Sequence, residues 1–338
     1  MAQQQNAAQL LSKQGKVEVG TRPVPVPQGK EVLVKVTAAA INPVDWMIVD
    51  LGIFINDFPA VLGLDGAGVI ETVGPDVKNF KVGDRVVFQG IYTPSDMATF
   101  QQYVLADIEA MAKIPANISD DQASTIPLGS ITALYGLFQK SGIAFPNSGP
   151  TATGKSIFIF RGSSSVGQFA IQLARIAGFS TIATTSSSQH TEFLKSLGAT
   201  HVFDRSADLS TIQSTIQLPF DRVFDIIGDL PTQSLAVDLL ITPSAAPGAH
   251  LGGVAPLHAS LKDKIEGKAT AHSVFAGSYL DPGLSVPFWQ TLTQWLEAGK
   301  FVSNRVQVVD GGLSGIVEAF DLSRKGVSGV KFVVHPQE

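Results

Sequence analysis

The chain has 338 residues, of which 44% are hydrophobic and 16% are charged, and its formal net charge is −5. This length is enough for two domains with buried cores, and the negative charge argues against nucleic acid or an anionic membrane as a main partner. The absence of cysteine from the sequence excludes disulfides, thiolate catalysis and cysteine-ligated metal sites. Since no apolar run reaches the length of a membrane span and the N-terminal residues lack the pattern of a signal peptide, we expect a cytoplasmic protein.

The first third of the chain is predicted to be rich in β-strand. Residues 31–37 alternate polar and apolar side chains, residues 66–73 open on glycine, and residues 84–88 follow a turn. Short strands separated by glycine-rich turns favour a compact, partly open barrel. Ser119 is expected to cap a helix, and residues 131–138 continue in helical spacing.

The middle of the chain alternates predicted strands with predicted helices. Strands are expected at 157–160, 181–185, 201–203, 222–227, 250–254 and 273–275, and helices after 166, through 193–197 and at 232–240. This alternation is what a parallel doubly wound sheet requires. The last residues return to strand at 305–309 and 331–335 around a helix at 315–322, so we expect the tail to rejoin the first domain.

One stretch, residues 156–167, carries the most specific local pattern. An apolar strand breaks into a turn of small residues and then into a helix, as in a dinucleotide-binding unit, with Gly162, Ser164 and Gly167 in the three glycine positions of the fingerprint. Gly162 is expected to make the tight turn, and Gly167 to let the helix pack closely on its strand. The Ser164 hydroxyl is able to donate to a phosphate oxygen, beside the free N–H groups of the helix start.

The end of the second strand of this unit indicates which dinucleotide is bound. An NAD site usually places an acid about 20 residues after the first glycine, and the residues here, 183–188, contain none. An acid would repel a 2′-phosphate, whereas the hydroxyls of Ser186 and Ser187 accept it. Three basic residues downstream, His190, Lys195 and Arg205, are expected to add positive charge, although each is otherwise an ordinary solvated surface residue. The sequence therefore predicts NADPH.

Four stretches together resemble one family. They are AAAINPVDW at 38–46, GLDGAGVIETVG at 63–74, FKVGDRV at 80–86 and FRGSSSVGQFAIQLA at 160–174. In order and spacing they are similar to the medium-chain dehydrogenases and reductases, in the zinc-free branch of quinone oxidoreductases and enoyl reductases, and most of all to fungal trans-acting enoyl reductases and their stand-alone relatives. The resemblance implies an α/β fold in which a GroES-like, β-rich domain (1–130 and 281–338) is interrupted by a Rossmann domain with a doubly wound parallel sheet (131–280).

The departures from the zinc alcohol dehydrogenases bear on the chemistry. Those enzymes have a cysteine where this chain has Asn42, and a Gly-His-Glu where it has Gly63, Leu64 and Asp65. Leucine cannot ligate zinc, so no metal is expected. Without a Lewis acid, reduction of an activated C=C bond fits better than alcohol oxidation, because the enolate needs only hydrogen-bond donors and a proton. Asp65 itself is interpreted as a structural carboxylate in a turn.

The resemblance also implies the residues around the cofactor and the substrate. Asp45, Thr132 and Tyr135 are the predicted catalytic residues, and Thr132 is otherwise a hydroxyl at a helix start. The predicted cofactor contacts are Pro43, Asp45, Trp46, Thr132, Gly162, Ser163, Ser164, Ser165, Val166, Gly167, Ser186, Ser187, His190, Lys195, Arg205, Gly252, Gly253, Val254, Phe275, Val327 and Ser328. The predicted substrate pocket is lined by Trp46, Phe54, Tyr92, Tyr135, Phe275 and Phe288.

The source of the second hydrogen is left with alternatives. Mitochondrial enoyl reductases of this family carry a tyrosine proton donor where the nearest aromatic residue here is Phe54, which has no proton to give. The proton then comes from water, from Tyr92 or from Tyr135, or the substrate is a quinone that needs no protonation at carbon.

These features predict an NADPH-dependent, zinc-independent reductase that transfers hydride to the β-carbon of an α,β-unsaturated carbonyl compound. The alternatives are quinone reduction and, from another class, a non-catalytic NADPH-binding protein or a subunit that assists a synthase. The resemblance implies an enone, enoyl thioester or quinone as substrate, and a polyketide synthase as the partner that some relatives serve. A monomer and a homodimer both stay open, the dimer through an edge strand expected at 273–275.

Overall fold

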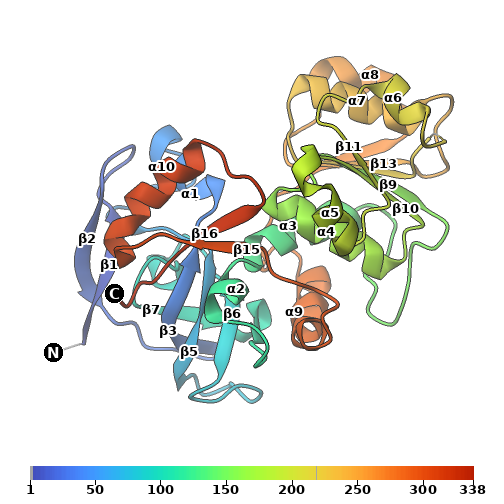
Figure 1. The fold of residues 1–338 in the computed structure, drawn as a ribbon. Helices are drawn as coiled ribbons and strands as arrows, with labels where there is room; N and C mark the ends of the chain where they lie inside the picture. Colours follow the sequence, from blue (N-terminus) through green and yellow to red (C-terminus); the bar gives the residue numbers. More distant parts are fainter. Residues whose placement is uncertain (1–2, 218) are drawn as a thin grey trace. The chain divides into compact units, whose positions relative to one another are not determined.

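The computed structural model describes residues 3–217 and 219–338, and the chain forms two compact units (Figure 1). The first unit runs to Leu128 and resumes with Gly277–Glu338, and the second is Gly129–Ala276. The domain limits expected from the sequence were 130 and 281.

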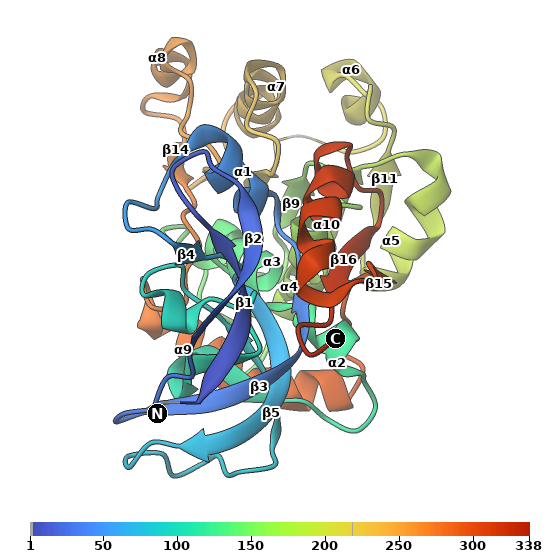
Figure 2. The same ribbon diagram turned by 90° about the vertical axis from the view of Figure 1, so that its left-hand side faces the viewer.

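The first unit is built from β-strands. A hairpin of β1 (Gln4–Leu10) and β2 (Val17–Pro23), seen in Figure 2, pairs with β4 (Ala60–Val61). The larger sheet has the order β15 (Arg305–Val308), β16 (Val330–Val334), β3 (Glu31–Ala40), β5 (Asp65–Val73), β6 (Arg85–Gln89) and β8 (Met111–Lys113), with β7 (Tyr103–Asp107) also on β3. The pairing of β16 with β3, Val333 opposite Ala40, confirms that the tail rejoins this unit.

Helices of the first unit border these sheets. They are α1 (Pro43–Leu51), α2 (Asp120–Ser124), α9 (Pro282–Glu297) and α10 (Ile316–Arg324), and Figure 1 shows α10 beside α1 and β16. Ser119 caps α2 as predicted, because its side chain accepts a hydrogen bond from the N–H of Gln122. Short 3₁₀ turns lie at Ser95–Met97, Ile108–Ala110 and Gly312–Gly315.

The second unit is a parallel sheet of β11 (His201–Phe203), β10 (Thr181–Thr185), β9 (Ser156–Ile159), β12 (Arg222–Asp225), β13 (His250–Gly253) and β14 (Thr270–Ser273), in that order. The chain leaves β9 toward β10 on one side and returns to β12 on the other, which is the order of a doubly wound nucleotide-binding fold. The predicted fold class is therefore confirmed. The switch point of such a sheet, where ligands bind, lies at the carboxyl ends of β9 and β12.

The helices of this unit are α3 (Pro127–Phe138, whose first residues belong to the first unit), α4 (Ser165–Ala177), α5 (Thr191–Leu197), α6 (Leu209–Gln213), α7 (Leu230–Ile241) and α8 (Lys262–Ile265), with 3₁₀ turns at Ser188–His190 and Ala259–Leu261. In Figure 2, α6, α7 and α8 lie in a row. The core between α7 and the sheet contains Phe158, whose ring lies 5.0 Å from that of Phe160 and 5.4 Å from that of Phe220. Burying each such ring contributes roughly 1.5–3 kcal/mol.

Two local predictions were wrong. The strand expected at 273–275 is β14, which ends at Ser273, because its partner β13 ends at Gly253 and leaves nothing further to pair with. Thr132 was given a helix start as its alternative role, but α3 begins at Pro127, so Thr132 lies in the second turn. In the described part of the chain, no helix is long and apolar enough to cross a membrane.

Candidate active site

The turn between β9 and α4 has the predicted strand, turn and helix, with a different residue in the strained position. Arg161 takes the left-handed conformation, with φ of 52°, whereas Gly162 does not. Gly162 is needed for space instead, since a Cβ there would lie 2.3 Å from Thr184 Oγ1. A Cβ on Gly167 would lie 2.4 Å from the Arg161 carbonyl oxygen, which confirms its close-packing role.

The start of α4 is capped by the residue that stands in place of the middle glycine. Ser164 Oγ accepts a hydrogen bond of 3.1 Å from the N–H of Gly167. The hydroxyl hydrogen of Ser164 is not used in this bond and is able to point away from the helix toward an acceptor. Ser163, Ser165 and Val166 complete the turn and are partly buried. The turn therefore combines a helix N-terminus with a hydroxyl donor, which suits an anionic group.

The end of β10 provides the second feature that fits a dinucleotide. Ser186 is buried, and its Oγ has no hydrogen-bond partner among the described residues. A buried hydroxyl without a partner is costly unless a ligand completes it. No acid lies at this strand end, and the half-buried Ser187 follows. These residues fit the ribose end of a bound dinucleotide.

The basic residues predicted near this loop differ in what they are able to offer. The Lys195 ammonium lies 3.2 Å from the Glu192 carboxylate, so its charge is partly neutralised on α5. His190 is buried at the turn before α5. Arg205 is exposed two residues after β11. Arg161 was not predicted; it is exposed beside the glycine turn, and its guanidinium has no ion pair or hydrogen bond within the described residues.

The remaining predicted residues of this unit lie on β13, after β14 and on α3. Gly252 packs on α3, since a Cβ there would lie 2.5 Å from the Gly136 carbonyl oxygen. Tyr135 is fully buried and Thr132 is partly buried. Phe275 is 61% exposed. The positions of Gly253 and Val254 at the end of β13 place them at the carboxyl edge of the sheet.

Sequence reasoning missed one buried acid at the same edge. Asp225 ends β12 and accepts hydrogen bonds from the N–H groups of Ile227 (2.9 Å) and Gly228 (3.1 Å). Burial raises the pKa of Asp225. The sequence could have indicated this residue, because it is an acid near the end of a predicted strand that precedes a helix. Its hydrogen bonds show that it stabilises the turn before α7.

The first unit contains a buried polar network around Asp45, which lies in the first turn of α1. Asp45 Oδ2 accepts a hydrogen bond of 2.7 Å from the N–H of Asn42, and Oδ1 accepts one of 2.8 Å from the Tyr92 hydroxyl. Asp45 is fully buried, whereas Tyr92 is partly exposed. Asn42 precedes α1 as its N-cap, and Pro43 begins the helix.

A second acid lies behind this pair. Asp65 accepts hydrogen bonds from Asn42 Nδ2 (3.0 Å), Lys331 Nζ (2.5 Å) and the N–H of Leu128 (2.7 Å). The expectation that Asp65 is a turn carboxylate was wrong, since Asp65 begins strand β5 and is fully buried in an ion pair with Lys331. The ion pair was not expected because Lys331 lies on β16, 266 residues from Asp65 in the sequence, and no local pattern connects the two positions. Lys331 also donates to Asn42 Oδ1 at 2.9 Å.

Burial sets the protonation of the Asp45 pair. It raises the pKa of Asp45 to about 7, against the lowering effect of the bonds from Asn42 and Tyr92. The nearby Asp65 raises the pKa of Asp45 further, and Lys331 lowers it. Burial and the neighbouring Asp45 raise the pKa of Tyr92 well above its ordinary value. A group titrating near neutrality beside a hydroxyl is suited to general acid–base chemistry.

The other aromatic residues predicted for the pocket have varied surroundings. Trp46 Nε1 donates to Ser323 Oγ at 3.1 Å, and the Arg324 guanidinium lies 5.8 Å from the Trp46 ring. Phe54 is 56% exposed and has a φ of 65°. Phe288 is fully buried and packs edge-on against Trp289, Trp295 and Phe301. Val327 and Ser328 are exposed between α10 and β16. Their roles at a cofactor or substrate stay predictions.

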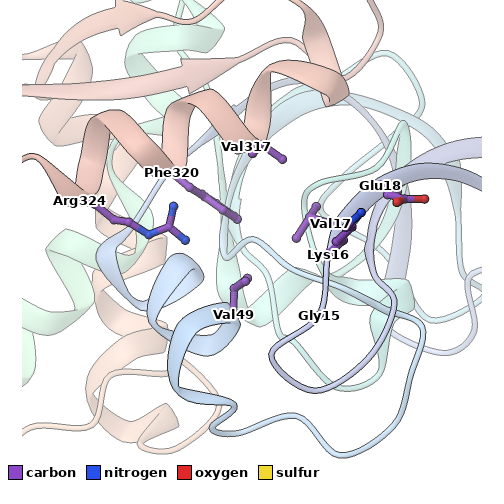
Figure 3. Close-up of a pocket in the computed structure, with 8 residues that line it drawn as sticks. All are labelled: Gly15, Lys16, Val17, Glu18, Val49, Val317, Phe320 and Arg324. Carbon is purple, nitrogen blue, oxygen red and sulfur yellow. The ribbon is translucent and has the colours of Figure 1, made fainter.

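A pocket of about 330 Å³ lies in the first unit, between the turn after β1, α1 and α10. Figure 3 shows the residues that line it. It is lined by Gly15, Lys16, Val17, Glu18, Val49, Val317, Phe320 and Arg324. Arg324 is held by Asp50 (2.7 Å) and Asp321 (2.6 Å). None of the predicted catalytic residues lines this cavity.

Two family models match the chain. One is described as an alcohol dehydrogenase GroES-like domain and covers residues 28–116, and the other is described as a zinc-binding dehydrogenase and covers residues 165–243. The chain is 34% identical over 342 residues to the trans-enoyl reductase himH of Aspergillus japonicus, covering 98% of this chain and 96% of that protein. It is 33% identical over 352 residues to the trans-enoyl reductase tndF of Aspergillus flavipes, covering 99% of each.

Solved structures share the fold over nearly the whole chain. An alcohol dehydrogenase superfamily protein from Novosphingobium aromaticivorans aligns with a TM-score of 0.82 and 25% identity, covering 98% of this chain and 99% of that one. The CurK enoyl reductase aligns with a TM-score of 0.77 and 21% identity, again covering 98% and 99%. The second alignment shows a common fold alone.

Proposed function

This chain is an oxidoreductase of the medium-chain dehydrogenase/reductase superfamily, and from this premise we propose that it is an NADPH-dependent, zinc-independent enoyl or enone reductase of secondary metabolism. The observation that carries the proposal is the end of β10, where the Ser186 hydroxyl is buried without a partner among the described residues and no acid is present. The trans-enoyl reductase relatives support the reaction class.

The preference for NADPH follows from charge. A carboxylate at the end of β10 would repel the 2′-phosphate, whereas Ser186 and Ser187 offer hydroxyl donors. Arg205 and Arg161 are exposed after the two strands that flank β10. The pyrophosphate would be held by the turn at 162–167 and the start of α4.

Zinc independence follows from what surrounds the two positions where zinc enzymes carry ligands. Asn42 Oδ1 and Asp65 Oδ2 both accept hydrogen bonds from the Lys331 ammonium, which already supplies a positive charge to these oxygens. Leu64 has no atom that is able to bind a metal. A cation at this place would have to displace the ammonium.

The chain's own residues then orient the substrate and supply a proton. Bound NADPH supplies the hydride for the β-carbon. The enolate oxygen needs hydrogen-bond donors, and Asp45, Thr132 and Tyr135 stay the proposed residues around the reacting groups. The substrate is an enone or enoyl thioester, and a polyketide synthase is the proposed partner that presents it. Quinone reduction is a second candidate, because Phe54 stands where a tyrosine donor would be expected.

The proposal is tested by measuring cofactor binding to variants that carry a new carboxylate at one end or the other of β10. Ser186→Asp should weaken NADPH binding by about tenfold, because the new carboxylate would repel the 2′-phosphate. NADH lacks that phosphate, so its binding should be affected less. Ser180→Asp adds the same charge before β10, at its other end, and should leave both affinities unchanged. Because Ser186 is buried, Ser187→Asp at the half-buried neighbour repeats the test with less risk to folding.

The affinities are measured by quenching of protein fluorescence, and the reaction by NADPH oxidation with product analysis. Tighter binding of NADH than of NADPH by the unmodified protein would overturn the cofactor assignment. Turnover of quinones alone would move the assignment to the second candidate. Cofactor binding without turnover of either substrate class would favour a non-catalytic NADPH-binding protein.

A further inference from the structure

Asp45 and Tyr92 form a pair in which one member is buried and the other reaches the surface. The Asp45 carboxylate is fully buried, and its hydrogen-bond donors among the described residues are the N–H of Asn42 and the hydroxyl of Tyr92. The Asn42 N–H is a backbone group that holds one carboxylate oxygen in place. Tyr92, in the loop after β6, is therefore the group through which Asp45 is able to exchange a proton.

The charged side chains near this pair do not neutralise the Asp45 carboxylate. Asp65 from β5 and Lys331 from β16 both form hydrogen bonds with the Asn42 side chain. They also form an ion pair with each other, with Lys331 Nζ 2.5 Å from the Asp65 carboxylate. Among the described residues, the Lys331 ammonium donates hydrogen bonds to Asn42 and Asp65 and none to Asp45. The Asp45 carboxylate is thus left without a cation of its own, and a buried carboxylate in that position takes up a proton readily.

Resting on the proposed function, we infer that Tyr92 donates the proton to the substrate α-carbon and that Asp45 resupplies Tyr92 from its buried position. Tyr92 is then a catalytic residue, and Asp45 is a positioning residue that acts through it. Lys331 and Asp65 hold Asn42, whose backbone fixes the second oxygen of Asp45.

The step balances in atoms and electrons. The two electrons enter the substrate with the hydride at the β-carbon and leave an enolate. The Tyr92 O–H bond breaks as the α-carbon C–H bond forms, while the Asp45 O–H bond breaks and a new Tyr92 O–H bond forms. Asp45 is left as a carboxylate that accepts the Tyr92 hydroxyl, as seen here, and it regains a proton from water through Tyr92 after the product leaves.

This arrangement has a defined pH dependence. Burial raises the pKa of Asp45 to about 7, so the competent, protonated pair is present below that pH and is lost as the pH rises through it. The charged and titratable groups that face Asp45 are Asp65, which disfavours its negative charge, and Lys331 and the Tyr92 hydroxyl, which favour it; burial outweighs both favourable effects. Carbon protonation should therefore slow as the pH is raised from 6 to 8, by about tenfold per unit above the pKa.

The first test compares two tyrosines and two substrates. Tyr92→Phe should lower kcat for an enone by about 10²-fold, the usual contribution of a general acid, and should leave kcat for a quinone within about threefold. Tyr103→Phe on β7 is the matched control and should change neither. Unchanged enone reduction by Tyr92→Phe, with NADPH binding and thermal unfolding also unchanged, would overturn the donor assignment while the proposed function stands.

The second test removes the resupplying acid and has a readout that does not depend on turnover. Asp45→Asn keeps the shape and the bond to Asn42, and should give enone reduction that is about tenfold slower at pH 6 and independent of pH up to 8. Infrared difference spectra should show a protonated carboxyl group that titrates near 7 and disappears in Asp45→Asn. A wild-type pH profile in Asp45→Asn, or the absence of that band at pH 6, would overturn the role of Asp45. Lack of turnover with either substrate by the unmodified protein would overturn the proposed function, and the infrared titration would still decide the state of the pair.

Discussion

At position 331 a lysine interrupts an apolar strand and places its ammonium 2.5 Å from the buried Asp65 carboxylate. Removing one partner of such a pair leaves an uncompensated buried charge. Lys331→Met should therefore lower the free energy of unfolding by about 3–5 kcal/mol, whereas the double change Asp65→Asn with Lys331→Met should recover most of it. Urea denaturation at pH 7 measures both. A single variant within about 1 kcal/mol of the unmodified protein would contradict a structural role for the pair.

The same residues show what single positions reveal before a structure is known. The cofactor turn was predictable, because Gly162, Ser164 and Gly167 lie within one short stretch and their roles follow from strand, turn and helix. The acid network was not, since Tyr92 lies 47 residues from Asp45 and Lys331 lies 266 residues from Asp65. Only the lysine in an otherwise apolar strand gave a local signal. The strain at Arg161 was also hidden, because glycine next to it was the obvious candidate for a left-handed turn.

At the scale of elements, strands β13 and β14 and helix α3 are joined by a pair of histidines. His272 Nε2 donates to the Tyr135 carbonyl (3.2 Å), so its Nδ1 accepts from His250 Nε2 (2.6 Å), and His250 Nδ1 accepts from the Thr270 hydroxyl (2.6 Å). With both rings neutral, every bond in this chain has one donor and one acceptor. Burial, His272 and Arg222 lower the pKa of His250 to about 4, and burial lowers that of His272.

A histidine with a lowered pKa stabilises the fold above its unfolded pKa of about 6.5 and loses that contribution as the pH falls toward 4. We expect the second unit to unfold at lower urea concentration at pH 5 than at pH 7, at a cost of about 1.4 kcal/mol per pH unit for one proton. His250→Gln should shrink this difference, and His258→Gln, at an exposed loop position, should not. Equal acid sensitivity in His250→Gln and the unmodified protein would rule out this origin.

Elements were predictable where hydrophobic periodicity decided them. Strands β10 and β11 have the predicted bounds, and the alternation of strands and helices gave the parallel sheet. The β1–β2 hairpin was not predicted, because a buried position of β1 is occupied by the polar Gln5 and the strand therefore lacks a clear apolar alternation. Gln5 bonds Gln101 Oε1 (3.2 Å) and the N–H of Tyr103 (2.6 Å), which no apolar pattern announces. The predicted bounds of β14 were wrong because the end of this strand is set by the length of its partner β13 and not by its own side chains.

At the scale of the molecule, each unit has its own hydrophobic core, so ligand binding should stabilise the two units by different amounts. The predicted phosphate and ribose contacts lie between 162 and 205, whereas the β1–β2 hairpin contains none of the predicted contacts. At about 100 times its Kd, NADPH should stabilise the structure that holds it by about 2.7 kcal/mol. Hydrogen exchange should therefore slow in β9, β10 and α4 and stay unchanged in β1 and β2, and NADH at the same concentration should produce a smaller effect. Equal protection of the hairpin and the β9–α4 turn, or equal protection by both cofactors, would contradict a site built on the Ser186 end of β10.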